Sequence, residues 1–273
     1  MKVNRQSLRR FNFTQNKLYF FRISFRGEMG IREELAAADF LCNIVFAIDF
    51  TESNAENGRE SFHGFPLHFL DPNALVANPY QRVMELCART MEDFDDDHSF
   101  PVFGFGDAVT TDKACFSLTP GGEEIEGIDA VVRRYREIVP FVCMRGPTSF
   151  APVIRKAADI SRAADSDGRR TFQILVIITD GQVTEPEPTA TAIIEACESP
   201  ISIIAVGVGD GPFDSLEHFD EHIAGRTFDN FHFTRFEAAM SDEEFFQNAF
   251  SEVPKQFREC SKMHKLKTKP HKE

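Results

Sequence analysis

Three segments of the chain place hard oxygen ligands where they could hold a small divalent cation. In the first segment, the carboxylate of Asp49 and the hydroxyls of Thr51 and Ser53 stand at positions i, i+2 and i+4. In the second, Thr148 follows an Arg-Gly-Pro turn, and in the third, Asp180 follows the apolar run 174–179. Mg²⁺ prefers oxygen donors and keeps part of its coordination shell for water or for another molecule's oxygen. We therefore predict a Mg²⁺ site, with Mn²⁺ or Ca²⁺ as alternative ions, formed by Asp49, Thr51, Ser53, Thr148 and Asp180.

The segments that must position these side chains alternate between strand-like and helix-like hydrophobic periods. Continuous apolar runs, typical of strands covered on both faces, occur at 44–50, 101–106, 174–179 and 201–208, with shorter candidate edge strands at 115–118 and 232–236. Amphipathic patterns predict helices over 31–38, 79–93, 125–139, 151–164, 189–198, 214–223 and 242–257. This alternation predicts an α/β fold built on an open, mostly parallel, doubly wound sheet with helices on both faces.

The predicted sheet explains how distant segments could share one cation. Ligands of open α/β sheets bind outside the carboxyl ends of the strands. Asp49 and Asp180 each follow a predicted strand, and Thr148 lies in the loop before a predicted helix. We therefore expect the three loops to meet at one edge of the sheet. The alternative is that each Asp merely caps the turn or helix that follows it.

The sequence offers no comparable set of catalytic residues. A phosphoaspartyl enzyme needs a second acid two residues after its Asp, and Thr51 stands there instead. The segment 207–211 resembles a dinucleotide loop, but its spacing is G-x-G-x-G and no Lys or Arg accompanies Asp210, so a glycine-rich turn is the preferred interpretation. Phosphate-loop, nucleophile-elbow and zinc-protease motifs do not occur. We therefore predict a binding module rather than an enzyme.

Charge is distributed unevenly along a chain whose net charge is −13. Seven Lys or Arg and no acid lie in residues 1–26, and five Lys with one Glu lie in 262–273, so the part between carries 18 basic and 42 acidic residues. Such an acidic body would repel nucleic acid and anionic lipid, which leaves membrane contact to the basic ends. We predict a basic arm (1–30), one domain (31–260) and a Lys-rich tail (261–273), with mitochondrial targeting by residues 1–26 as a minor alternative.

Cysteine usage and hydropathy bear on the compartment. The six cysteines lie far apart, without a C-x₂-C pair or a Cys/His knuckle. We expect Cys42, Cys87, Cys143 and Cys197 to be buried thiols of a reducing compartment. No apolar stretch approaches the roughly 18 residues that a transmembrane helix needs. The predicted location is the cytoplasm, with a membrane-associated or nuclear location as the alternatives.

The predicted ligands also carry a family resemblance. A D-x-[S/T]-x-S loop, a distant Thr and a later Asp form the metal-ion-dependent adhesion site of von Willebrand factor A domains, and all five residues match it, with Thr51 where many members have Ser. Surrounding segments resemble the copine branch: 78–80, 104–107, 146–152 and 207–211. The segments 135–140 and 228–231 are most similar to the copine-type domain of plant RING-type ubiquitin ligases. The resemblance extends from about residue 31 to about residue 257 and implies a Rossmann-like von Willebrand A fold.

The same resemblance implies a function. In the family, hydroxyls and Asp side chains hold the metal directly or through water, and the free position accepts an Asp or Glu of a protein partner. Copines carry two C2 domains ahead of this module and the plant ligases carry a RING after it. Neither is expected in this chain, so C2-mediated membrane docking and direct ubiquitin transfer are not expected either. The alternatives are a substrate-recognition part or adaptor of a ubiquitin ligase, and a copine-like peripheral membrane signalling protein.

Overall fold

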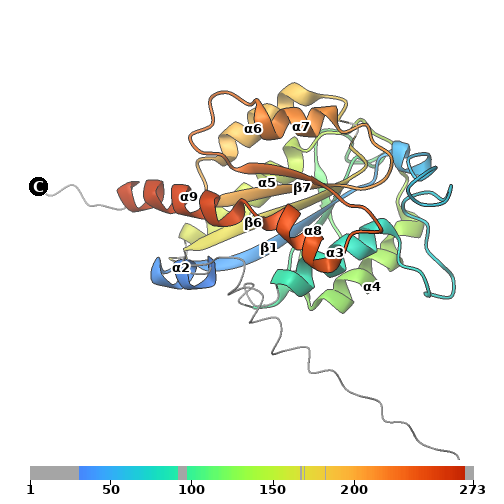
Figure 1. Cartoon of the computed structure of the whole chain (residues 1–273), viewed down its shortest axis with the longest axis horizontal. Helices are drawn as coiled ribbons and strands as arrows, with labels where there is room; N and C mark the ends of the chain where they lie inside the picture. The colour runs from blue at the N-terminus through green and yellow to red at the C-terminus, as the bar shows by residue number, and fades with distance from the viewer. Residues whose placement is uncertain (1–30, 92–96, 167, 169, 182, 268–273) are drawn as a thin grey trace, which may run out of the picture.

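The computed structural model describes residues 31–91, 97–166, 168, 170–181 and 183–267. Strands and helices alternate along this part of the chain (Figure 1). In chain order the elements are α2 (Ile31–Ala37), β1 (Leu41–Asp49), the 3₁₀ turn η1 (Glu52–Ala55), α3 (Pro79–Met91), β2 (Ser99–Phe100), β3 (Val102–Phe105), β4 (Cys115–Ser117), β5 (Ile125–Glu126), α4 (Ile128–Ile138), η2 (Val139–Phe141), α5 (Ala151–Ser166), β6 (Thr171–Thr179), α6 (Pro186–Ala196), β7 (Ile201–Gly207), α7 (Asp214–Glu221), β8 (Phe231–Arg235), α8 (Asp242–Phe250) and α9 (Val253–Lys267).

Six strands form the central sheet in the order β4-β3-β1-β6-β7-β8. All neighbouring pairs are parallel except β3 and β4, which are antiparallel. The chain builds outward from β1 to β3 and β4, then crosses to the other side of β1 and adds β6, β7 and β8. The direction of winding thus reverses between β1 and β6, and such a reversal is where open α/β sheets bind ligands. The predicted mostly parallel sheet with short edge strands is confirmed.

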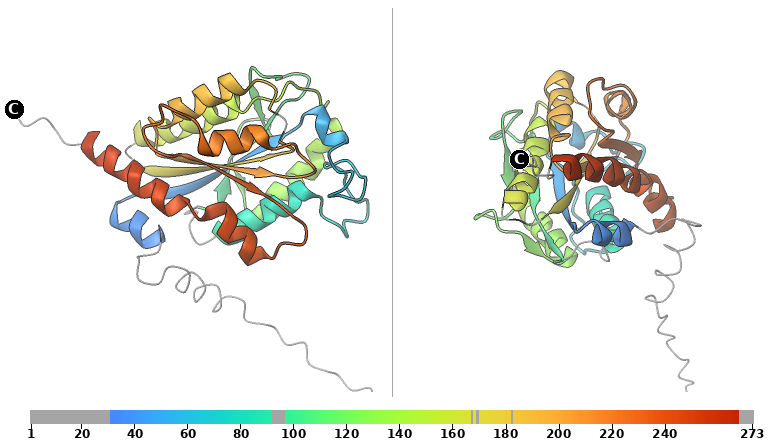
Figure 2. Two further views of the ribbon diagram at one scale, coloured as in Figure 1. Left: turned by 45° about the horizontal axis from the view of Figure 1, so that its top comes forward. Right: turned by 90° about the vertical axis from the view of Figure 1, so that its left-hand side faces the viewer.

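Helices cover both faces of the sheet, as Figures 1 and 2 show. The core on one face includes residues of α3, α4, α8 and α9, and the core on the other face includes residues of α5, α6 and α7. In β1, Ile44, Phe46 and Ile48 face the first group of helices, whereas Val45 and Ala47 face the second. Because successive side chains of a strand point to opposite faces, a strand buried on both sides must be apolar throughout.

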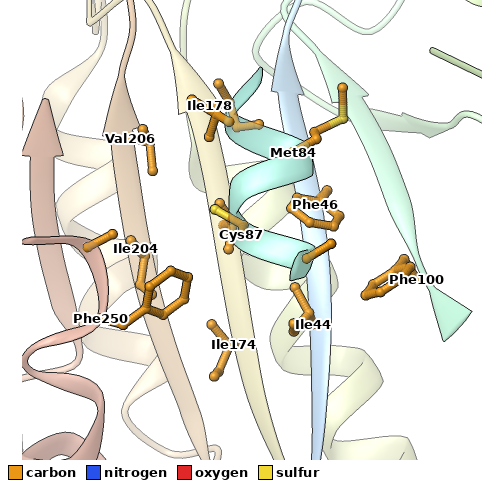
Figure 3. Packing of buried hydrophobic residues seen from close by; sticks show 14 of the residues in the cluster. Ile44, Phe46, Met84, Cys87, Phe100, Ile174, Ile178, Ile204, Val206 and Phe250 are labelled. Atoms are coloured by element: carbon orange, nitrogen blue, oxygen red, sulfur yellow. The ribbon is translucent and has the colours of Figure 1, made fainter. Parts of the chain in front are cut away.

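The first of these cores shows why α3 is amphipathic. Met84 and Cys87 of α3 belong to one buried cluster with Ile44 and Phe46 of β1 (Figure 3). Phe250 of α8 belongs to the same buried cluster. Burial of each such side chain contributes roughly 1.5–3 kcal/mol to folding, so this layer fixes the central strands whose ends carry the predicted ligands.

The structure corrects two predicted helices. The helix expected over 125–139 begins only at Ile128, because Ile125–Glu126 forms β5 and pairs with β2. The helix expected over 242–257 is two helices, since α8 ends at Phe250 and α9 begins at Val253. Pro254 is the second residue of α9, and proline is tolerated in the first turn of a helix but not in its interior.

The predicted burial of the cysteines is correct for three of the four. Cys42, Cys87 and Cys197 are buried, whereas Cys143 is exposed in the loop that leads to Thr148, and all six thiols are free. None of the described helices combines the length and the apolar character needed to cross a bilayer. The predicted basic arm (1–30) and the end of the Lys-rich tail (268–273) lie outside the described residues, and the predicted boundary at 260/261 falls within α9.

Phe257 tests whether α9 is an integral part of the domain. Its ring packs edge-on against Phe40, with centroids 5.4 Å apart, and against Phe172 at 5.1 Å. We expect Phe257→Ala to lower the free energy of unfolding by about 3–5 kcal/mol in a urea titration, because it leaves a cavity between α9 and the sheet. Phe141→Ala is the matched control, since that ring is 86% exposed and its loss should change stability by about 0.5 kcal/mol at most. Equal effects of the two changes would contradict the observed docking of α9.

Candidate metal centre

Backbone contacts bring the three predicted ligand loops to the same edge of the sheet. The Glu52 amide donates to the Arg145 carbonyl at 3.0 Å, and Thr51 and Arg145 form a β-bridge. The Thr184 amide donates to the Thr148 carbonyl at 3.1 Å. The first pair of contacts joins the loop after β1 to the loop before α5, and the second joins that loop to the one after β6. The expected convergence of the loops is therefore present in the fold.

Asp49 is the most constrained residue of the group. It is fully buried at the end of β1. Its Oδ1 accepts hydrogen bonds from the Thr51 amide at 2.9 Å and from Thr51 Oγ1 at 2.7 Å, and its Oδ2 accepts from Thr179 Oγ1 at 2.6 Å. Because both carboxylate oxygens are engaged, the side chain is fixed in one orientation before any ligand arrives. Such support of a metal-binding group typically changes metal affinity by 10- to 100-fold.

The other candidate ligands are connected to this carboxylate in different ways. Thr51 Oγ1 lies 3.1 Å from Ser53 Oγ, so direct contacts join Asp49, Thr51 and Ser53. Asp180 is fully buried directly after β6, and its Oδ2 accepts from Asn57 Nδ2 at 2.9 Å. Thr148 is 3% exposed, and its amide donates to Thr184 Oγ1 at 3.3 Å. Thr148 is thus linked to the other candidate ligands through the backbone of its loop, and Asp180 follows β6, the strand beside β1.

The electrostatics of the group are dominated by negative charge in a dry environment. Burial, and next the charge of Asp180, raise the pKa of Asp49 to about 7, although hydrogen bonds from Thr179 and Thr51 oppose the shift. The pKa of Tyr80 is also raised well above its ordinary value, first by burial and then by the charges of Asp49 and Asp180. Two carboxylates in this position disfavour each other's ionised form, and a divalent cation between them would remove that penalty.

A buried aromatic layer supports the loop from below. The His68 ring stacks between Phe50, at a centroid distance of 4.9 Å, and Tyr80, at 4.1 Å. His68 Nε2 lies 2.8 Å from the Asp49 carbonyl oxygen, and Nδ1 lies 2.7 Å from the Tyr135 hydroxyl. Since a carbonyl only accepts, Nε2 carries the proton. Burial lowers the pKa of His68 to about 3, so the ring is neutral and holds the backbone of Asp49 without offsetting its charge.

Close approach of the strand β3 explains one glycine beside the site. Gly106 follows β3 with φ +78°, in the left-handed region that glycine adopts readily. A Cβ atom at this position would lie 2.3 Å from Thr51 Cγ2, which is too close for any other residue. The glycine therefore lets the end of β3 pack against the ligand loop.

Three supporting residues escaped the sequence prediction. Thr179 holds Asp49, Asn57 holds Asp180, and Asn54 ties the loop to the aromatic layer, since its Nδ2 donates to the Thr51 carbonyl at 3.1 Å and its Oδ1 accepts from the Tyr80 hydroxyl at 2.6 Å. The sequence did indicate Thr179, because it is a polar residue that ends the apolar run 174–179 and directly precedes Asp180. Asn57 gave no signal, because its partner is 123 residues away.

Comparison with known proteins identifies the family. A family model described as Copine matches residues 66–269. Copine family protein 1 of Caenorhabditis elegans is 41% identical over 224 residues, which cover 79% of this chain and 20% of that protein. The E3 ubiquitin-protein ligase RGLG1 of Arabidopsis thaliana is 39% identical over 244 residues, which cover 82% of this chain and 48% of that protein. This chain thus spans half or less of the length of both relatives.

Solved structures agree on the fold. The crystal structure of the SpRpn10 VWA domain matches with a TM-score of 0.51 at 12% sequence identity, covering 76% of this chain and 95% of that one. At this identity the likeness supports the architecture alone, and that architecture is the predicted von Willebrand A fold. With a copine family model spanning most of its length and copine-like sequences among its relatives, this chain belongs to the copine family.

Proposed function

We propose that this domain is a Mg²⁺-dependent protein-binding module, and that its metal-ion-dependent adhesion site consists of Asp49, Thr51, Ser53, Thr148 and Asp180. One observation carries the proposal. Two fully buried carboxylates stand at the ends of the neighbouring strands β1 and β6, and the charge of Asp180 helps to raise the pKa of Asp49. Burying two like charges is costly unless a counter-charge accompanies them. A divalent cation supplies that counter-charge.

The donor set supports Mg²⁺ over softer metals. The two carboxylates would supply negative oxygens, and Thr51, Ser53 and Thr148 would supply neutral hydroxyl oxygens. Mg²⁺ favours such all-oxygen sites, whereas imidazole and thiolate donors favour zinc and copper. When bound, the ion would act as a Lewis acid that takes one further oxygen. Because two carboxylates balance its charge, a third carboxylate from a protein partner can be accepted without a large excess of negative charge.

Exposed apolar side chains on neighbouring loops support a protein partner. Val109 and Phe141 are each 86% exposed. Their loops run side by side, since the Ala108 amide donates to the Cys143 carbonyl at 2.8 Å and Asp107 forms a β-bridge with Met144. The second of these loops continues into Arg145 and Thr148. Apolar groups of a partner could pack against these side chains, so the partner proposed here presents an Asp or Glu flanked by apolar residues.

A ubiquitin-ligase role is the second candidate, and the relatives favour it. Besides RGLG1, the protein named E3 ubiquitin-protein ligase RGLG3 of Arabidopsis thaliana is 39% identical over 236 residues, which cover 62% of that protein. In this alternative the same adhesion site would hold a ubiquitination substrate, and the domain would act as recognition part or adaptor. Both candidates assign binding, not catalysis, to residues 31–260, flanked by the basic arm and the Lys-rich tail. Six free thiols support a reducing compartment such as the cytoplasm.

Thermal unfolding with and without Mg²⁺ tests the metal site. At about one hundred times its dissociation constant, the ion should stabilise the wild-type fold by roughly 2.7 kcal/mol relative to EDTA. Asp49→Ala and Asp180→Ala should lose this response. The control is Asp159→Ala, an exposed carboxylate on α5 that pairs with Arg162 of the same helix, and it should respond as the wild type does. No response in the wild type, or an equal response in Asp49→Ala, would refute the proposed ligands.

Partner capture tests the second half of the proposal. Immobilised wild-type protein in Mg²⁺ should retain proteins that EDTA releases. Thr148→Ala should fail to retain them, because the metal loses a ligand. This variant leaves the acidic charge of the domain unchanged. Blocking exposed carboxyl groups of the captured protein should abolish its binding. Retention that is indifferent to EDTA and to Thr148→Ala would show that partners bind elsewhere on the domain.

The pKa of Asp49 predicts the pH dependence of the metal-free protein. This pKa is about 7 in the folded state, against an ordinary value of 3.8. Between these values the folded state retains a proton that the unfolded state has released, so the free energy of unfolding should fall as the pH rises from about 4 to 7. In urea unfolding with EDTA, the free energy of unfolding should be a few kcal/mol lower at pH 7.5 than at pH 5. Asp49→Asn is the reference, because its side chain has no carboxyl group to titrate and should not show this drop. A rise relative to that variant would contradict the predicted shift.

A further inference from the structure

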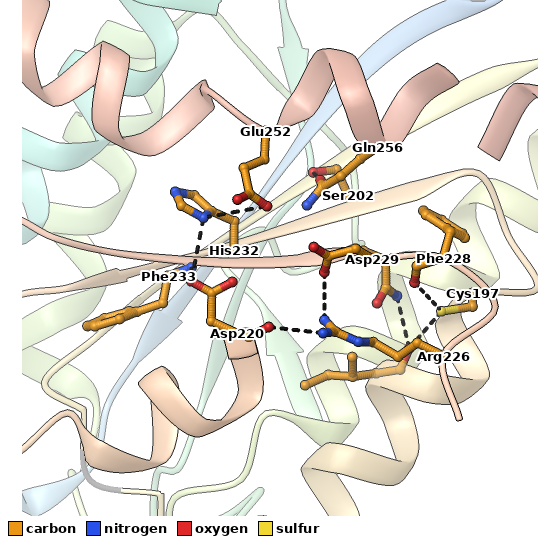
Figure 4. Close-up of polar contacts among 12 residues, drawn as sticks. Cys197, Ser202, Asp220, Arg226, Phe228, Asp229, His232, Phe233, Glu252 and Gln256 are labelled. Atoms are coloured by element: carbon orange, nitrogen blue, oxygen red, sulfur yellow. Dashed lines mark hydrogen bonds and ion pairs between the residues drawn. The ribbon is translucent and has the colours of Figure 1, made fainter. Parts of the chain in front are cut away.

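A second group of metal-binding side chains lies away from the adhesion site. Asp220 of α7, His232 of β8 and Glu252 of the turn between α8 and α9 bring one ligand atom each within 4.8 Å of one another (Figure 4). His232 pairs with Ile204 near the start of β8, the edge strand, and β7 separates β8 from β6. The group is therefore distinct from the site at the carboxyl ends of β1 and β6.

The hydrogen bonding of His232 determines which of its nitrogens faces the carboxylates. Nε2 lies 2.7 Å from the Asn248 carbonyl oxygen. Since a carbonyl can only accept, Nε2 carries a proton, and in the neutral ring Nδ1 then carries a lone pair. Nδ1 faces Asp220 Oδ2 at 3.6 Å and Glu252 Oε2 at 3.8 Å. A lone pair facing two carboxylates is unfavourable unless a cation lies among them or Nδ1 is protonated.

Two of these three atoms, His232 Nδ1 and Glu252 Oε2, are buried without a hydrogen-bond partner in the part of the chain that the structure describes. The cations nearby serve another acid, since Arg226 Nη1 lies 2.8 Å from Asp229 Oδ1 and Lys255 Nζ lies 3.8 Å from Asp229 Oδ2. Asp220 and Glu252 therefore have no Lys or Arg counter-charge among the described residues. A buried polar atom without a hydrogen bond costs about 1–3 kcal/mol, and a cation among these three ligands would offset that cost.

The spacing and the donor types agree with a transition metal. Zn²⁺ binds His nitrogen at about 2.0–2.1 Å and carboxylate oxygen at about 2.0–2.2 Å, so neighbouring ligand atoms of a tetrahedral site lie about 3.4 Å apart. The observed 3.6 and 3.8 Å are too long for hydrogen bonds but close to that separation. We propose that Asp220, His232 and Glu252 form a second cation site, selective for Zn²⁺ over Mg²⁺, with water in the fourth position.

The surrounding structure holds the ligands in place and suggests what the ion does. The Phe233 amide donates to Asp220 Oδ2 at 3.1 Å, and Arg226 Nη2 donates to the Asp220 carbonyl at 2.9 Å. The three ligands come from α7, from the edge strand and from the junction of the two C-terminal helices (Figure 4). An ion here would fasten these segments to one another. We therefore assign such an ion a structural role, holding the junction of α8 and α9 to the edge strand β8 and to α7.

Two surface features could bind zinc adventitiously and must be controlled. His218 and His222 lie one turn apart on and just after α7, with stacked rings 5.4 Å apart, and His222 Nδ1 lies 3.7 Å from Glu221 Oε2. Both members of the latter pair are more than 60% exposed. Cys143 is an exposed thiol. His222→Ala and Cys143→Ser remove these sites and leave the proposed one intact.

The test is a zinc titration of the full chain carrying Asp49→Ala and Asp180→Ala, so that the adhesion site cannot contribute. Calorimetry should show one equivalent of Zn²⁺, and at about one hundred times the dissociation constant Tm should rise by roughly 5–10 °C. His232→Gln and Glu252→Gln should each abolish both effects, whereas His222→Ala and Cys143→Ser should not. Mg²⁺ should neither compete nor raise Tm. The result for this zinc site therefore does not depend on whether the adhesion site binds Mg²⁺.

The absorption spectrum of bound Co²⁺ gives a second test of the ligand types, which remains valid if a variant misfolds. Metal-free unfolding first establishes whether each variant is folded, and Co²⁺ bound to the parent chain should give only the weak visible bands of nitrogen and oxygen ligands. Intense thiolate charge-transfer absorption would place the metal on cysteine and overturn the proposal. Absence of zinc binding would overturn it too. Zinc binding that survives both His232→Gln and Glu252→Gln, or is lost in His222→Ala, would also contradict it.

Discussion

The repulsion between Asp49 and Asp180 is the constraint on which the rest of this structure depends. Both carboxylates are fully buried at the ends of neighbouring strands. Hydrogen bonds from the neutral donors Thr51, Thr179 and Asn57 hold the two carboxylates in place. A neutral His68 beneath the loop adds rigidity and no charge. The cation proposed for this site would offset the repulsion between the two acids.

The topology of the sheet explains why these particular residues meet. The winding reverses between β1 and β6, so the loops leaving these two strands diverge to opposite faces and leave room between them. Two apolar cores clamp the strands from both sides and prevent the ends from shifting. Among the described residues β8 is the last strand on its side of the sheet, and His232 of the group formed by Asp220, His232 and Glu252 belongs to it. An all-oxygen site at the centre and a histidine-containing site at the edge suit different ions.

Much of this arrangement is visible in the sequence, for a physical reason. Parallel strands buried on both faces are continuous apolar runs, so the four main strands and the acids that end two of them could be predicted. Pro254 was a local signal for the break between α8 and α9, but the amphipathic pattern over 242–257 continued past it and favoured a single helix. Exposed Cys143 was misplaced because apolar neighbours do not guarantee burial in a loop. Asn57 and the Asp220–His232–Glu252 group depend on tertiary contacts between segments whose spacing follows no motif, so single-sequence reasoning had no means of finding them.

The most direct test of this account is anomalous diffraction at the manganese edge from crystals grown in Mn²⁺, an ion that substitutes for Mg²⁺ at oxygen sites. The account predicts a peak between the carboxylates of Asp49 and Asp180, within coordination distance of the hydroxyls of Thr51, Ser53 and Thr148. That peak should vanish in Asp49→Ala crystals grown under the same conditions. A saturating Mn²⁺ concentration that leaves this position without a peak would contradict the claim that the two buried acids exist to hold a cation.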